Sequence, residues 1–324
     1  MNTMKWLLKR EFWEHKGGFF WAPVIAAGIY LLMCILTVLA GHQAVVHGDV
    51  TEFHSNLAQM VRDAADPDKA AQVSDGVQVA FQFFAAMPMI VGVFVVFFYC
   101  LGCLYNDRVD KSILFWKSLP ISDRDSVIAK VASAMFIAPA IATAVAILSA
   151  LCMWVIASLF VLAHGASPMA LWNIRGIAAA CANLIGSIPV TSLWALPTIG
   201  WLMLCSSWAR RVPFLWATVV PIVGGIMLGI TGLMSAFRLN GEWYWTNIVG
   251  RILWGLVPGM EKVYRYNDGV HVLRHAQDGE QVAQLFSLQD TLLGLANPQL
   301  WIGAVAGIAM IVAATRLRRW RDEG

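Results

Sequence analysis

The chain has 324 residues, of which 59% are hydrophobic and 13% are charged, and its formal net charge is +3. A soluble domain is roughly 45–50% apolar and about 25% charged, and its surface must be more polar than this composition allows. The composition excludes a disordered chain, a collagen, a secreted disulfide scaffold and a nucleic-acid-binding surface. It predicts an integral membrane protein.

Six stretches without Asp, Glu, Lys or Arg are long enough to cross a bilayer, which takes about 20 apolar residues. Every charged residue lies outside their apolar cores, as expected where an ionised side chain costs roughly 2.5–3.5 kcal/mol. A β-barrel would instead show alternating segments of about ten residues. We predict an all-α polytopic membrane protein with six transmembrane helices. The predicted spans cover residues 19–40, 80–104, 131–163, 176–205, 212–237 and 298–315.

Residues 1–18 are predicted to form a helix that ends at Gly17-Gly18 and lies in the membrane interface. Glu11 interrupts its apolar face. The apolar part of the first span is longer than that of a signal peptide, so we expect a retained anchor. The residues expected at the headgroups are Trp6, Lys9, Arg10 and Trp13.

The distribution of charge predicts the orientation. One side holds both termini, the 105–130 loop, Arg210, Arg211 and the basic tail 316–324, with 15 basic and 8 acidic residues. The other side holds segments 41–79, 164–175 and 238–297, with 8 basic and 12 acidic residues. Because Lys and Arg concentrate in cytoplasmic segments, we expect both termini to be cytoplasmic. The six spans place residues 19–315 in one membrane domain.

Small residues and cysteines inside the spans are expected to serve packing. All six cysteines fall in spans, so no disulfide framework is predicted for the outer segments. Cys100 and Cys103 match C-x-x-C, and we interpret them as buried structural thiols. Gly303 and Gly307 form a small-xxx-small pattern that permits close helix approach.

The 105–130 loop contains both charge signs and a hydrophobic centre, Ile113–Trp116. We predict a short helix with one apolar face, stopped at Leu119-Pro120 and followed by a helix that Ser122-Asp123 caps. The apolar face could dock a cytoplasmic partner. It could equally pack against the inner ends of this protein's own helices.

The outer segment 238–297 carries aromatic residues typical of the membrane interface. Within it, Ile248–Met260 is apolar but shorter than a span, so we expect it to lie in the interface or to enter the membrane and return.

Catalytic motifs are missing from the sequence. It has no G-x-x-x-x-G-K-[ST], H-E-x-x-H or G-x-S-x-G motif and no carboxylate within a span. Ion-coupled transporters often use an ionisable residue near the midplane. The predicted spans contain no Asp, Glu, Lys or Arg, so the energy for any transport would come from another subunit. The 105–130 loop is where that subunit would apply force. An enzyme would need the scattered outer histidines, which we interpret as solvated loop residues; they are His42, His47, His54, His271 and His275.

Taken together, these features resemble the permease subunit of a type-2 ABC exporter. The resemblance covers nearly the whole chain and depends most on the loop NDRVDKSILFWKSLPIS and its position between spans two and three. It implies that this loop forms a coupling helix that inserts into a separate ATPase subunit. The implied ATPase contacts are Asn106, Asp107, Arg108, Asp110, Lys111, Phe115, Trp116, Lys117, Leu119 and Pro120. It also implies re-entrant helices around Trp245–Tyr264, with an outer gate at Trp245, Trp254, Pro258 and Tyr264.

The leading hypothesis is an exporter of an amphipathic or hydrophobic substrate, such as a lipid, peptide or drug-like molecule, in a bacterial cytoplasmic (inner) membrane. Its expected partners are the ATPase subunit, a second permease copy or paralogue and the lipid bilayer, with no nucleic acid. The chain itself would carry no cofactor, no metal and no catalytic residue, since ATP and Mg would bind the partner. The alternative is a non-transporting membrane scaffold or sensor that binds a cytoplasmic protein through the same loop.

Overall fold

The described part of the chain is helical and contains no strand. Six of the described helices are long and apolar enough to cross a membrane, which supports the prediction of an all-α, multi-pass membrane protein. The computed structural model describes residues 3–47, 63, 66, 69–110, 122–163, 167–230, 241–265 and 287–321.

In chain order, the long helices are α2 (Ala22–His47), α4 (Ala70–Gly102), α8 (Ala138–Ala163), α9 (Ile174–Trp208), α10 (Pro213–Ile230) and α18 (Pro298–Arg321). Four of them, α2, α4, α9 and α18, extend beyond the apolar cores from which their spans were predicted, whereas the described part of α10 lies within its predicted span. The third span is longer than α8 alone, because α7 (Asp123–Ala132) and the π-helical turn η2 (Ser133–Ile137) lead into it. Much of the predicted basic tail is likewise helical, as part of α18.

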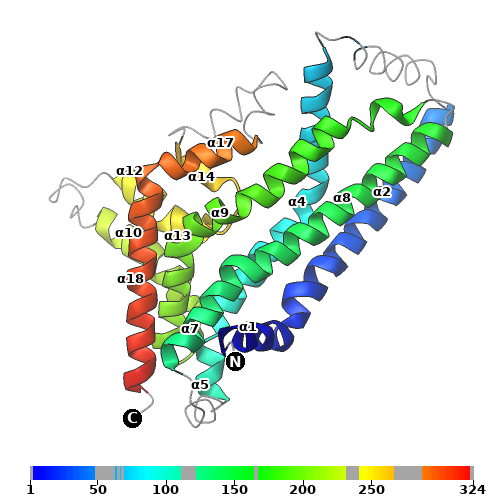
Figure 1. Ribbon diagram of the computed structural model, residues 1–324. Coiled ribbons are helices and arrows are strands. Elements are labelled where there is room, and N and C mark those ends of the chain that lie inside the picture. The colour runs from blue at the N-terminus through cyan, green and yellow to red at the C-terminus, as the bar shows by residue number, and fades with distance from the viewer. Residues whose placement is uncertain are drawn as a thin grey trace.

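Helices α2, α4 and α8 pack side by side, and α9 connects them to α18 (Figure 1). The N- and C-terminal ends lie at the same end of the molecule, together with α1 (Thr3–Glu14), α5 (Tyr105–Val109) and α7. We call this the terminal end. The opposite end carries a set of short helices, namely α12 (Gly241–Tyr244), η4 (Trp245–Gly250), α13 (Arg251–Trp254), α14 (Met260–Arg265), α17 (Leu288–Leu293) and η5 (Gly294–Ala296).

Helix α1 ends earlier than the glycine pair suggested. It stops at Glu14, and the π-helical turn η1 (Gly17–Trp21) joins it to α2. Neither Gly17 nor Gly18 has the positive φ of a left-handed helix cap. The prediction of a glycine C-cap was therefore wrong, because π-helical backbone bonds continue the chain through the bend.

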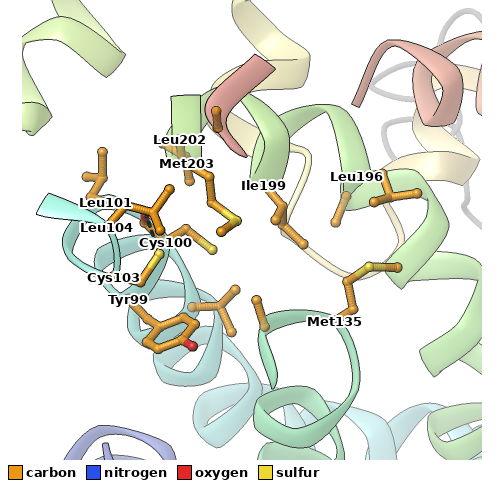
Figure 2. Packing of buried hydrophobic residues seen from close by; sticks show 14 of the residues in the cluster. Tyr99, Cys100, Leu101, Cys103, Leu104, Met135, Leu196, Ile199, Leu202 and Met203 are labelled. Carbon is orange, nitrogen blue, oxygen red and sulfur yellow. Dashed lines mark hydrogen bonds between the residues drawn. The ribbon is translucent and has the colours of Figure 1, made fainter. Parts of the chain in front are cut away.

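The main core forms where α4, η2 and α9 meet near the terminal end (Figure 2). Cys100 of α4 and Cys103, the C-cap residue of that helix, pack there among Leu104, Leu202 and Met203, and both thiols are buried and free of disulfides. The Cys103 thiol donates to the Cys100 carbonyl oxygen at 3.4 Å. The prediction that both thiols of the C-x-x-C pair are buried is confirmed.

Candidate functional site

Two helices that make buried contacts within the protein flank the central part of the predicted coupling loop. Residues 111–121 lie outside the described residues, but α5 precedes them and α7 follows them. Ser122 caps α7, and its Oγ accepts from the Asp125 amide at 3.1 Å. The predicted cap is therefore confirmed. Both flanking helices lie at the terminal end, beside α1 (Figure 1).

Lys130 of α7 is the centre of a buried charge network. Its side chain is 1% exposed, and its Nζ lies 3.2 Å from Glu11 Oε1 and 3.4 Å from Asp107 Oδ1. Glu11 is fully buried and also accepts a 2.9 Å hydrogen bond from Tyr99 Oη. An isolated buried charge is very costly. The Glu11 and Asp107 carboxylates and the Lys130 ammonium therefore stabilise one another in their charged forms.

Arg318 extends this network to α18. Its Nη1 lies 3.3 Å from Asp107 Oδ2, and its Nε lies 3.8 Å from Asp123 Oδ1. Its side chain is 3% exposed. Charges thus alternate from α1 through α7 and α5 to α18. We call these residues the terminal charge network: Glu11, Lys130, Asp107, Arg318 and Asp123.

The network controls the charge state of Glu11. Burial alone would raise the pKa of this carboxyl, but Lys130 and Arg10 offset that effect and hold the pKa below its ordinary value. A carboxyl with a depressed native pKa stabilises the fold above its unfolded pKa, and this contribution is lost as the pH falls through the native pKa.

We therefore expect the melting temperature of the purified protein to fall on acidification below about pH 4.3, the ordinary pKa of a glutamate. Glu11→Gln should melt lower at pH 7 and lose less on acidification than the wild type. Melting curves from pH 7 to pH 3 would measure this, with the exposed Glu14→Gln as control. Equal pH dependence of Glu11→Gln and wild type would contradict the assignment.

Four of the predicted ATPase contacts lie among the described residues, where two of them are exposed and two bond within the chain. Asn106 and Asp110 are exposed, whereas Asp107 is buried in the network. Arg108 donates from Nη2 to the carbonyl oxygens of Ser206, at 2.6 Å, and Ala209, at 3.0 Å. The remaining predicted contacts lie outside the described residues: Lys111, Phe115, Trp116, Lys117, Leu119 and Pro120.

Helix α1 presents two different sides. Trp6 and Trp13 are 57% and 62% exposed, and Lys9 and Lys16 lie over their rings at 5.3 and 5.6 Å from the centroids. Arg10 was predicted to lie beside the tryptophans, but its guanidinium contacts Glu11. The apparent intrusion of Glu11 on the apolar face is thus the site of an ion pair.

At the opposite end, Arg251 holds the short helices against α9 and α18. Its guanidinium carbon lies 3.9 Å from the centroid of the Trp194 ring, and its Nη1 donates to the Gln299 carbonyl oxygen at 2.9 Å. Thr198 Oγ1 donates to the Arg251 carbonyl oxygen at 2.7 Å. A guanidinium over a desolvated ring gains cation–π stabilisation, so Arg251 fixes where α13 sits.

Three of the predicted outer-gate residues, Trp245, Trp254 and Tyr264, belong to these short helices, and Pro258 lies in the turn between α13 and α14. Trp245 is 40% exposed and packs beside Gly225 of α10. Tyr264 packs against Trp194, with 5.2 Å between ring centroids, and donates to the Thr246 carbonyl oxygen at 2.6 Å. The other two, Trp254 and Pro258, line a cavity.

That cavity has a volume of about 910 Å³ and is walled by α4, α9, α10 and the short helices. Gly259 follows Pro258 with a φ of 89°, a left-handed conformation that favours glycine, and this turn leads α14 over the cavity. Ligand cavities in proteins measure roughly 300–1,000 Å³. The cavity is therefore large enough for a small-molecule ligand.

Within the described ranges, no group of three or more His, Cys, Asp or Glu could hold a metal ion. His54, His271 and His275 lie outside those ranges. Comparisons with protein-family models, with curated proteins and with solved structures find no match for this chain.

Proposed function

We propose that this chain is the transmembrane permease subunit of an ATP-driven type-2 ABC exporter of an amphipathic or hydrophobic substrate. The terminal charge network carries the proposal. It ties the helices on both sides of residues 111–121 to α1 and α18 through buried charges. Force applied to residues 111–121 would therefore be transmitted to several helices at once.

The anchoring explains how a docked ATPase would move the membrane helices. Force on residues 111–121 reaches α5, which Arg108 and the Ser206 hydroxyl join to the end of α9, and α7, which continues into α8. Helix pairs joined by buried ion pairs and hydrogen bonds move as units, which suits a rigid-body change between inward-facing and outward-facing states. The energy comes from ATP and Mg on the partner subunit.

The proposal divides the predicted contacts by role. Asn106 and Asp110, which are exposed, remain candidate contacts to the ATPase, together with the predicted contacts among residues 111–121. Asp107 and Arg108 instead hold the loop in position, because both bond within the chain. The apolar face Ile113–Trp116 lies outside the described residues, and the proposal assigns it to docking on the ATPase.

The orientation belongs to the same proposal. The terminal end faces the cytoplasm of a bacterial cell, since the ATPase acts there. Helix α1 then lies in the inner-membrane interface, with Trp6 and Trp13 at headgroup depth. The short helices around Arg251 re-enter the membrane from the outer side. A second permease copy or paralogue completes the transport pathway.

The test is co-purification with an ABC ATPase subunit, which would be sought among the genes that neighbour the gene for this chain. We expect Phe115→Asp combined with Trp116→Asp to reduce the co-purified ATPase by tenfold or more, since truncating a docked aromatic anchor costs about 2 kcal/mol or more. Stimulation of ATP hydrolysis should fall with it. The control is Arg319→Asp, at an exposed position on α18.

Each outcome of this test has one meaning. If the double variant associates and stimulates hydrolysis like the wild type, the coupling assignment is wrong. If the wild type binds the ATPase without changing its activity, while the variant loses binding, the scaffold alternative is correct and the exporter is not.

A further inference from the structure

The cavity between α4, α9, α10 and the short helices is long, and its lining is mostly apolar. Along α4 the lining runs from Gln82 to Phe98, which is about 24 Å at the 1.5 Å rise of a helix. The hydrocarbon core of a bilayer is about 30 Å thick. The length of the cavity therefore suits one extended hydrocarbon chain.

The cavity wall near the terminal end is aromatic and lies at the outside of the helix bundle. Phe97 and Phe98 of α4 contact Phe214 of α10, with ring centroids 6.3 and 6.4 Å apart. Phe94 and Phe98 are 59% and 58% exposed, and α4 is apolar enough to span a membrane. Exposed phenylalanines on such a helix suit contact with lipid, so the bilayer is the source from which an alkyl chain would enter the cavity.

The opposite end of the cavity offers a hydrogen-bond donor. Asn183 of α9 lines this end and is 6% exposed, and its Oδ1 accepts from Thr291 Oγ1 at 3.0 Å. The Asn183 amide nitrogen carries two N–H groups and has no hydrogen-bond partner among the described residues. Because a buried donor without a partner is costly, this nitrogen needs an acceptor from within the cavity, either water or a ligand.

The charged side chains at this end are already engaged within the chain. Glu261 and Lys262 line the cavity from α14, and each interacts with other groups of the protein. One such contact joins Lys262 Nζ to Asp290 Oδ2 at 3.7 Å. A charged headgroup would lose its water on entering and would need a counter-charge. We therefore expect recognition through a hydrogen bond to Asn183 and not through a charge.

We propose that the cavity binds a single-chain amphiphile with an uncharged headgroup that accepts a hydrogen bond, such as a monoacylglycerol. The alkyl chain lies along α4 toward Phe98, and the ester carbonyl oxygen accepts from Asn183 Nδ2. This inference deepens the proposed function, and it rests on that function only for the idea that the bound molecule is exported. Binding itself requires no ATPase.

The test uses the full chain in phosphatidylcholine nanodiscs and photoreactive probes. The first probe is a monoacylglycerol with a 16-carbon chain that ends in a diazirine, and the second is the alkane with the same chain and diazirine. After illumination, mass spectrometry maps the labelled peptides, and labelling of α2, which does not line the cavity, corrects for the probe dissolved in the bilayer. We expect labelling near Phe98 and Phe214 to be about fivefold stronger for the monoacylglycerol, the factor that one net hydrogen bond gives.

Asn183→Leu tests the headgroup contact. It removes the amide, while Thr291 Oγ1 keeps the Ser287 carbonyl oxygen as a partner at 3.0 Å. We expect this variant to label about fivefold less with the monoacylglycerol and unchanged with the alkane. The control Asn106→Leu, at an exposed position of the terminal end, should keep the preference of the wild type.

Two filling variants test the position of the chain. Ala86→Phe and Thr218→Trp fill the cavity from α4 and from α10, so each should reduce labelling near Phe98 and Phe214 by both probes to the level of α2. Two variants are used so that misfolding of one leaves the test decisive.

Two further probes test the prediction of an uncharged headgroup. They are the amine and the sulfonate of the same chain and diazirine, and we expect neither to label the cavity more strongly than the alkane does. Stronger labelling by either one would show that a charge is recognised and would overturn the proposal.

Three other results would also overturn it. Equal labelling by the monoacylglycerol and the alkane would mean that water satisfies Asn183. Monoacylglycerol labelling that Asn183→Leu or both filling variants leave unchanged would place the probe elsewhere, and an absence of labelling would show that the cavity is closed to the bilayer. Because the assay contains no ATPase, failure of binding and failure of the coupling test are independent results.

Discussion

Lys130→Met is expected to lower the free energy of unfolding by about 3 kcal/mol, near the lower end of the 3–5 kcal/mol found when one partner of a buried ion pair is removed. Lys130 is 1% exposed and lies between Glu11 and Asp107. Its loss leaves two buried carboxylates without their shared ammonium. The loss is limited because Arg318 still contacts Asp107 and Arg10 still contacts Glu11.

The measurement is thermal unfolding in detergent, with the exposed Lys9→Met as the matched control. The double variant Glu11→Leu with Lys130→Met should recover most of the lost stability, because replacing both partners by apolar residues is often neutral or stabilising. A double variant that melts as low as Lys130→Met would show that size, and not charge, determines the stability at this site.

The same variant tests the proposed coupling to an ATPase. Since Lys130 ties α7 to α1, breaking the tie should weaken the link between residues 111–121 and the membrane helices. In the double variant with restored stability, we expect normal binding of the ATPase and reduced transport. Normal transport in that variant would mean that the network only stabilises the fold.

The spans were predictable because their signal is local. A helix buried in lipid requires about 20 consecutive uncharged residues, and six such stretches stand out in the sequence. The cap at Ser122 was also predictable, because a cap depends on residues within one turn. The boundaries were less accurate, since charged residues continue the same helices beyond the membrane-spanning cores.

The terminal charge network was not predictable, because its members are distant in sequence. Glu11 and Lys130 are 119 residues apart, and Arg318 is near the end of the chain. Lys130 and Arg318 counted only as positive charges flanking spans. The one local signal was Glu11 on an apolar helix face, which the sequence analysis noted only as an interruption of that face. Arg251 was also missed, because its partners, the Trp194 ring and the Gln299 carbonyl oxygen, are distant in sequence and carry no opposite charge.

Gly307→Ala should destabilise the protein by about 1–3 kcal/mol, the usual cost of overpacking a core. A Cβ at Gly307 would lie 2.5 Å from the carbonyl carbon of Leu196 and 2.7 Å from the Pro197 nitrogen. A Cβ at Gly200, on the facing helix, would lie 2.6 Å from the Gly307 carbonyl oxygen. Backbone atoms cannot rotate away as a side chain can, so α9 and α18 would have to separate.

The matched control is Gly229→Ala in α10, where a Cβ would meet nothing within 4 Å. There the higher helix propensity of alanine should leave stability unchanged or raise it by up to about 1 kcal/mol. Size-exclusion profiles after heating would compare the two variants with the wild type. Equal melting of Gly307→Ala and Gly229→Ala would show that α9 and α18 do not meet at their backbones. If α18 separates from α9, the contact between Arg318 and Asp107 should weaken as well, and Gly307→Ala should reduce ATPase coupling together with stability.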